Sequence, residues 1–176
     1  MRIHTLIVGP IDTNCYIVED EASKKAMIID PGEEAGKILS HLKNLQLKIE
    51  AIVITHGHFD HIGALDAVQA ETGAAVLEPA DGQKVSIGSL SFTVIHTPGH
   101  SHESLCLYSE KEGVLFSGDT LFAGTWGRTD LPFSSEEEMR ISLRKLLALP
   151  PDTKVYPGHG RPTTIGKEQG LLKELC

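Results

Sequence analysis

Cysteine is scarce in this chain of 176 residues, and its three copies, Cys15, Cys106 and Cys176, lie far apart. An odd number of cysteines outside any CxxC pattern indicates neither a disulfide framework nor a thiolate zinc site. We therefore expect Cys15 and Cys106 to be small, buried hydrophobic residues.

Long apolar runs and a positive balance of charge are also absent. No run of about 18 apolar residues occurs, and the N-terminal stretch has no apolar core of signal-peptide length. The formal net charge of −8 opposes nonspecific binding to nucleic acid or to an anionic membrane, because both require a positive field. We expect one cytoplasmic domain, residues 1–176, that binds neither nucleic acid nor membrane; the oligomeric state stays open.

Apolar periodicity alternates between strands and helices along the chain. Strands are expected at residues 3–8, 13–19, 25–29, 50–55, 74–78, 83–87, 90–96, 104–108, 113–117 and 154–157. Helices are expected at 33–45, from 62 to a cap at Gly73, from the capping boxes that begin at Ser134 and Ser135, and at 163–175. This order fits two packed sheets with outer helices, and it also fits a three-layer α/β sandwich.

The segment THGHFDHIG, residues 55–63, concentrates titratable side chains directly after the predicted strand EAIVIT. His56 and His58 are two residues apart, so in an extended segment their rings project to the same side. Asp60 and His61 begin the next helix, where a carboxylate suits the helix dipole. Imidazole and carboxylate are the usual ligands of zinc and neighbouring first-row metals at neutral pH. The segment therefore predicts a metal site.

Three further candidate ligands follow other predicted strands, and each stands beside glycine. TPGH places His100 after strand 90–96, SGDT places Asp119 after strand 113–117, and PGHG places His159 after strand 154–157. Glycine at the end of a strand lets a loop bring a side chain over the sheet edge. Together with the first motif, these residues are candidate ligands of a metal site.

Seven segments stand in the order of a known family: DTNCYIV, IIDPG, THGHFDHIG, HTPGHS, SGDTLFAG, GRTDLP and VYPGHGRPTTIGKE. The chain thereby resembles the metallo-β-lactamase fold superfamily, and most closely the short bacterial glyoxalase II-like thioesterases without the C-terminal helical domain. The resemblance implies an α/β fold, an αββα four-layer sandwich of two packed mixed sheets with helices outside. It also implies two divalent metal ions, with zinc expected and iron or manganese as alternatives. His56, His58 and His100 would bind one ion, Asp60, His61 and His159 would bind the other, and Asp119 would bridge both.

The chemistry of such a pair favours hydrolysis of thioesters. Two ions that share a water lower its pKa towards about 7, so hydroxide forms and attacks the carbonyl at neutral pH. Asp60 would orient or deprotonate this water. A thiolate leaves without strong acid help, because thiol pKa values lie near about 8.5. We expect a hydroxyacylglutathione hydrolase that acts on S-lactoylglutathione or a similar small-molecule thioester.

Three alternative functions stay open. Persulfide dioxygenases of the superfamily share the GRTD element, here residues 127–130, and use one iron, but their closing motif differs from PGHG. A lactonase or other ester hydrolase and a metal-binding sensor without turnover are the others. Asp119 argues against β-lactam hydrolysis as the native role, because resistance enzymes lack an aspartate at this position.

The remaining candidates have two interpretations each. Arg128 could bind a substrate carboxylate or form a surface salt bridge. His102, where the short group commonly has proline, could lie near the site or in an exposed turn. Phe122 and Trp126 could line the substrate entrance or pack in the core. Asp30 could support a metal ligand, although a turn carboxylate before Pro31 is the simpler interpretation.

Overall fold

The computed structural model describes residues 1–174, without the side chains of 147 and 172–174. Its chain divides into two compact units. Unit 1 comprises residues 1–79 and 84–91, and unit 2 comprises residues 80–83 and 92–176. None of the helices in the described part of the chain is long and apolar enough to cross a membrane. That both units form one domain stays a prediction, as does the cytoplasmic location.

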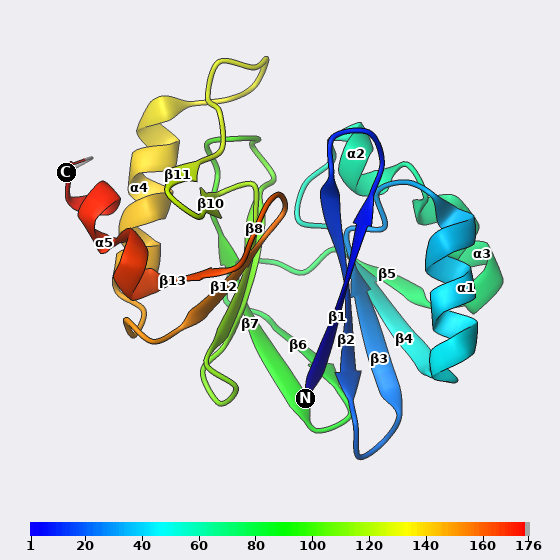
Figure 1. The fold of residues 1–176 in the computed structure, drawn as a ribbon. Helices are drawn as coiled ribbons and strands as arrows, with labels where there is room; N and C mark the ends of the chain where they lie inside the picture. Colours follow the sequence, from blue (N-terminus) through cyan, green and yellow to red (C-terminus); the bar gives the residue numbers. More distant parts are fainter. Residues whose placement is uncertain (175–176) are drawn as a thin grey trace. The chain divides into compact units, whose positions relative to one another are not determined.

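Unit 1 is built on a mixed sheet with the strand order β1-β2-β3-β4-β5. The strands of this sheet are β1 (Arg2–Val8), β2 (Thr13–Asp20), β3 (Lys25–Ile29), β4 (Lys48–Val53) and β5 (Ala75–Leu77). Unit 1 also contains strand β6 (Lys84–Ile87) and the helices α1 (Ala35–Leu45), α2 (Phe59–Ile62) and α3 (Leu65–Thr72). Helices α1 and α3 lie on one face of this sheet (Figure 1), where Ile38 and Val68 pack with Ile28 and Ile52 in one core. Strands β3 and β4 are parallel and end opposite each other, which brings the segments after them to one sheet edge.

Unit 2 contains a second mixed sheet, in which β13, β12, β9, β8 and β7 follow one another. Its elements are β7 (Leu90–His96), β8 (Leu105–Ser109), β9 (Val114–Gly118), β10 (Leu121–Phe122), β11 (Thr125–Trp126), α4 (Glu136–Leu147), β12 (Lys154–Pro157), β13 (Thr163–Thr164) and α5 (Ile165–Glu174). Met139 and Leu143 of α4 and Ile165 of α5 pack against Leu115 and Val155 of the sheet. Strands β9 and β12 are parallel neighbours, so the segments that follow them also share one edge.

The predicted α/β class, with two mixed sheets and helices, is confirmed. The predicted helix from 62 to Gly73 is wrong in one respect, because it is two helices that break at Gly63 and Ala64. At the break, the Ala64 amide donates to the Pro31 carbonyl at 3.0 Å instead of continuing α2. Gly73 does end α3 in the left-handed region, with φ of 65°.

Three smaller differences concern unit 2. Only Ser135 caps α4, accepting from the Glu138 amide at 3.2 Å, whereas the Ser134 hydroxyl donates to the His100 carbonyl at 2.8 Å. The long loop after Asp119 contains the β10–β11 hairpin. Residues 163–164 form strand β13 instead of beginning the last helix, and the predicted end of that helix at 175 lies outside the described residues.

Candidate metal centre

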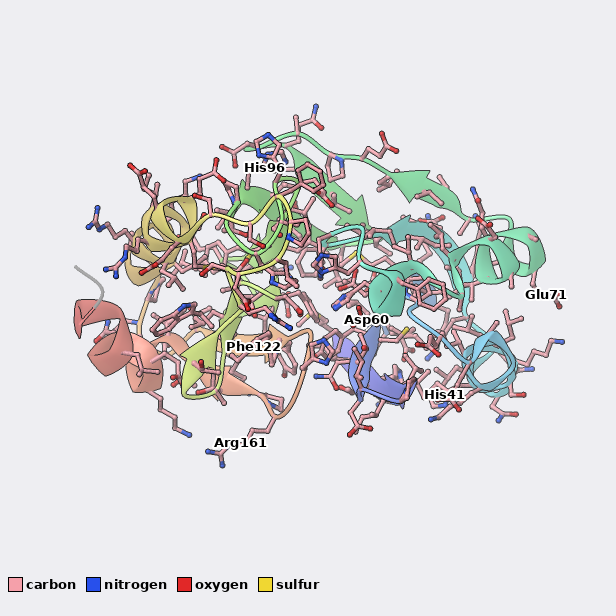
Figure 2. All side chains as sticks on the ribbon, turned by 90° about the horizontal axis from the view of Figure 1, so that it is seen from above. His41, Asp60, Glu71, His96, Phe122 and Arg161 are labelled. Carbon is pink, nitrogen blue, oxygen red and sulfur yellow. The ribbon has the colours of Figure 1, made fainter. Side chains whose placement is uncertain are left out.

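Unit 1 carries four of the predicted ligands in the segment after β4 and in α2. His56 and His58 point to the same side, as their spacing predicts: His56 Nε2 lies 3.0 Å from His58 Nδ1. The ring of His61, from α2, has its centroid 4.1 Å from that of His56. Asp60 lies at the start of α2 (Figure 2), and its Oδ2 is 3.3 Å from His61 Nε2. All four side chains therefore gather at one end of β4 within this unit.

Asp30, directly after β3, organises this cluster. Its side chain is buried, and one oxygen, Oδ2, accepts hydrogen bonds from the Thr55 hydroxyl at 2.7 Å and from His61 Nδ1 at 2.9 Å. The other oxygen, Oδ1, accepts from the Thr55 amide at 2.7 Å. The simpler interpretation of Asp30 as only a turn carboxylate is thus wrong, because it contacts a predicted ligand directly.

These hydrogen bonds decide which ring nitrogen carries the proton. His61 Nδ1 must donate, because the carboxylate of Asp30 can only accept. The Thr55 hydroxyl gives its proton to Asp30, so it accepts from His56 Nδ1, which lies 3.2 Å away. In neutral His56 and His61 the lone pair therefore resides on Nε2. Metal-bound histidines in proteins commonly donate a hydrogen bond from the ring nitrogen that does not bind the metal.

Thr13, at the start of strand β2, orients the side chain of Asp60. The hydroxyl of Thr13, which is buried at the start of β2, donates to Asp60 Oδ2 at 2.9 Å. The same oxygen lies 3.3 Å from His61 Nε2. The hydroxyl consequently fixes the carboxylate next to the lone pair of His61.

Unit 2 carries the other three predicted ligands. Asp119 follows β9, His159 follows β12, and His100 lies in the loop after β7. His100 Nδ1 donates to the Arg128 carbonyl at 2.9 Å, so in neutral His100 the lone pair resides on Nε2. Asp119 Oδ2 lies 3.5 Å from His100 Nε2 and 3.5 Å from His159 Nε2. One carboxylate oxygen thus faces two imidazoles.

The carboxylate–imidazole distances in each unit fit two ligand atoms bonded to one ion. Two ligand atoms bonded at about 2.1 Å to a tetrahedral metal lie about 3.4 Å apart, whereas a direct N–H···O bond averages about 2.9 Å. The carboxylate–imidazole separations of 3.3 Å in unit 1 and 3.5 Å in unit 2 match the first value. Unit 1 offers His56, His58, Asp60 and His61, and unit 2 offers His100, Asp119 and His159, as residues able to hold a metal. The donor set of imidazole and carboxylate suits a divalent first-row metal.

Two glycines permit the close backbone packing behind these ligands. A Cβ atom at Gly32 would lie 1.7 Å from the Asp60 carbonyl oxygen, and one at Gly127 would lie 1.9 Å from the Asp119 carbonyl oxygen. Neither position can accept a larger residue without moving the backbone of a predicted ligand.

The other candidates lie in different surroundings. Arg128 donates to Asp130 from Nε at 2.7 Å and from Nη2 at 2.8 Å, and both side chains are exposed. This ion pair raises the pKa of Arg128 and lowers that of Asp130. Phe122 has its ring centroid 6.1 Å from that of His159, Trp126 packs against the core of unit 2, and His102 is exposed.

Sequence reasoning missed Thr13 and Thr55, which orient Asp60 and link His56 to Asp30. Thr55 stands directly before His56, and Thr13 lies in the first segment of the family pattern, so their positions gave a usable signal. The carbonyl of Arg128 gave none, because a backbone acceptor leaves no trace in the residue type.

A family model described as the metallo-beta-lactamase superfamily matches residues 8–87 and 76–159. The chain belongs to this superfamily. It is 30% identical to hydroxyacylglutathione hydrolase GloC of Haemophilus influenzae, over 96% of this chain and 95% of that protein. The solved structure of BLEG-1 B3 metallo-beta-lactamase matches with a TM-score of 0.91 and 37% identity, over 97% and 99% of the two chains. TTHA1623 in a di-iron-bound form matches with a TM-score of 0.86 and 33% identity, over 94% and 96%.

The predicted metallo-β-lactamase fold is confirmed by these matches. Members of the superfamily are metal-dependent hydrolases, and relatives of this chain include hydroxyacylglutathione hydrolases. The clusters of histidine and aspartate in each unit agree with the divalent-metal chemistry of the superfamily.

Proposed function

We propose that the chain is a binuclear metal-dependent hydrolase of small thioesters, with conversion of S-lactoylglutathione to lactate and glutathione as its reaction. The seven residues would act as one centre: His56, His58 and His100 for one ion, Asp60, His61 and His159 for the other, and Asp119 for both. Zinc is expected, with iron or manganese as alternatives. The observation that carries the proposal is Asp119 Oδ2, which lies 3.5 Å from the Nε2 atoms of two histidines assigned to different ions.

The chemistry of the residues supports hydrolysis. A pair of divalent ions supplies Lewis acidity and lowers the pKa of water towards about 7. Asp60 would accept a proton from the attacking water, and the Thr13 hydroxyl would keep its carboxylate in place through the 2.9 Å hydrogen bond. The leaving thiolate needs little proton donation, because thiol pKa values are about 8.5. Arg128 stays a prediction as a substrate contact, and a substrate carboxylate there would compete with Asp130.

The test combines metal analysis with a substrate panel. The purified protein should hold about two metal ions per chain and hydrolyse S-lactoylglutathione. Asp119→Ala should lose both metal content and rate by orders of magnitude, whereas the control Asp152→Ala removes an exposed carboxylate of the same unit and should retain both. One iron per chain with oxygen consumption on glutathione persulfide would instead identify a dioxygenase. Full metal without turnover on thioesters and lactones would favour a sensor.

A second candidate, β-lactam hydrolysis, is favoured by one observation. The matched structure with 37% identity over nearly its whole length is named a B3 metallo-beta-lactamase. Asp119 argues for thioesters as the native substrates, so β-lactams belong in the same panel. A kcat/KM for a β-lactam above that for every thioester would reject thioesters as the preferred substrates.

A further inference from the structure

The loop that carries His100 is attached to helix α4 of the same unit. Lys145 Nζ donates a hydrogen bond to the His96 carbonyl at 2.7 Å, and the Ser142 hydroxyl donates to the Pro98 carbonyl at 2.6 Å. Both donors belong to α4, and both acceptors precede His100 in the loop. Helix α4 thus fixes the beginning of this loop at two points.

The end of the loop is held by two adjacent serines, both of which the sequence marks as caps of α4. The Ser135 amide donates to the Gly99 carbonyl at 2.8 Å, and its hydroxyl accepts from the Glu138 amide at 3.2 Å. The Ser134 hydroxyl instead donates to the carbonyl of His100 at 2.8 Å. Of the two hydroxyls, that of Ser135 therefore caps the helix, whereas that of Ser134 contacts a predicted metal ligand.

The segment that ends at Ser134 also holds the ring of His100. Arg128 begins this segment, and its carbonyl accepts from His100 Nδ1 at 2.9 Å. The backbone of His100 and the ring nitrogen that faces away from the candidate metal site are thus both fixed, so the side-chain torsions between them have little freedom. This arrangement keeps His100 Nε2 at 3.5 Å from Asp119 Oδ2. Ligands whose orientation is fixed by hydrogen bonds of this kind bind metal more tightly.

A tight turn places the Ser134 hydroxyl. The Ser134 amide donates to the Leu131 carbonyl at 3.1 Å, which closes a four-residue turn with Pro132 and Phe133 at its centre. Phe133 has a φ of 65°, in the left-handed region. Proline followed by a residue with positive φ is the pattern of a type II turn. Because proline fixes its own φ, the turn presents Ser134 to His100 with little backbone freedom.

We propose that Ser134 is the positioning residue of the metal ligand His100. Its hydroxyl acts through the His100 carbonyl: it holds this peptide so that the ring keeps its hydrogen bond to the Arg128 carbonyl and presents Nε2 beside Asp119. The inference rests on the proposed function, which assigns His100 to a metal ion, and deepens it by naming a residue that controls how tightly this ion is held.

The two adjacent serines provide a matched test. Ser134→Ala removes the donor to the His100 carbonyl, and in competition against a chelator it should lose zinc affinity about tenfold, the lower end of the range for partners that orient a metal ligand. Ser135→Ala removes the cap of α4 and keeps the amide that donates to Gly99. It should lower the thermal midpoint at least as much as Ser134→Ala does, while its zinc affinity stays within about twofold of the wild type. Ser134→Thr retains a hydroxyl donor and should stay within about threefold.

Loading with cobalt(II) reports ligand geometry, which a change in stability alone does not alter. The ligand-field absorption bands should shift in Ser134→Ala and should match those of the wild type in Ser135→Ala and Ser134→Thr. Equal zinc affinities and identical cobalt spectra in the two alanine variants would overturn the inference. Neither measurement needs turnover. If the wild type hydrolyses no thioester and Ser134→Ala still loses zinc affinity, the proposed function is refuted and the positioning role is supported.

Discussion

Replacing Asp30 with asparagine should weaken metal binding more than it weakens the fold. The wild-type carboxylate accepts three hydrogen bonds, from the Thr55 amide, the Thr55 hydroxyl and His61 Nδ1. Asparagine has one side-chain oxygen that accepts and one side-chain NH2 group that only donates. Its shape is nearly that of aspartate, and asparagine tolerates the left-handed φ of 53° at this position. The change therefore alters hydrogen bonding without adding backbone strain.

Either orientation of the new amide disturbs the ligand set. If the asparagine oxygen stays with the Thr55 backbone N–H, the asparagine NH2 group faces His61 Nδ1, which then becomes an acceptor, and the ring proton moves to Nε2. If the asparagine side chain is flipped, its NH2 group faces the Thr55 N–H, and this buried donor loses its partner at a cost of about 1–3 kcal/mol. Loss of such an orienting partner typically lowers metal affinity about 10- to 100-fold. We expect a loss of that size for Asp30→Asn.

The assay is a competition for metal against a chelator of known affinity, with the thermal midpoint measured on the same samples. Asp20→Asn is the matched control: Asp20 is also a buried carboxylate of unit 1, and it accepts from the Ser23 hydroxyl at 2.7 Å and the Ser89 amide at 2.8 Å. Both variants should have lower thermal midpoints, and only Asp30→Asn should lose metal affinity. Equal metal affinity in the two variants would refute the tautomer argument.

Three other predictions follow. Gly127→Ala should lower activity and stability, because its Cβ would lie 1.9 Å from the Asp119 carbonyl oxygen, whereas Gly36→Ala, with no heavy atom within 4 Å, should stabilise α1 by up to about 1 kcal/mol in thermal unfolding. The hydrogen bond from Lys24 lowers the pKa of Glu19, so this carboxylate stabilises the fold above its unfolded pKa of about 4.3. The difference in thermal midpoint between the wild type and Glu19→Gln should therefore shrink as the pH falls from about 7 to about 3, and a constant difference would contradict this role. Burial raises the pKa of the Cys106 thiol to about 11, so in a Cys176→Ser background it should resist alkylation at pH of about 8 until the protein unfolds, as mass spectrometry would show.

Local patterns predicted most of the secondary structure, and tertiary contacts explain the differences. The apolar run that forms β4 was recognisable because Ala51, Ile52 and Val53 are consecutive apolar residues, and all three are buried in the sheet. The break between α2 and α3 was not, since it depends on the bond from the Ala64 amide to the Pro31 carbonyl, far away in sequence. Strands β10, β11 and β13 have two residues each, too short for any periodicity to show.

The candidate ligands were predictable for a related reason. Their residue types are those a metal requires, and each stands where an apolar strand ends. Within each unit the structure brings these side chains to ligand spacing, while a single centre formed by all seven stays a proposal. The role of Asp30 was harder to predict, because its contact with Thr55 depends on the register that pairs Ile29 with Val53 in β3 and β4. Periodicity within one segment indicates which face its side chains occupy, whereas the pairing of Ile29 with Val53 also depends on how two separate segments align in the sheet.

The two proposed ions should be held with unequal strength. One would have three imidazoles and Asp119, whereas the other would have Asp60 in place of one imidazole, and so one more negative charge. His61 is also backed by the carboxylate of Asp30, while His100 is backed only by the neutral Arg128 carbonyl, and a carboxylate partner makes an imidazole the stronger donor. Removal of metal by increasing chelator should therefore occur in two phases, with His58→Ala abolishing the weaker phase. Removal of both ions in a single phase would contradict this prediction. It would show that the shared ligand Asp119 couples the two ions so that they leave together.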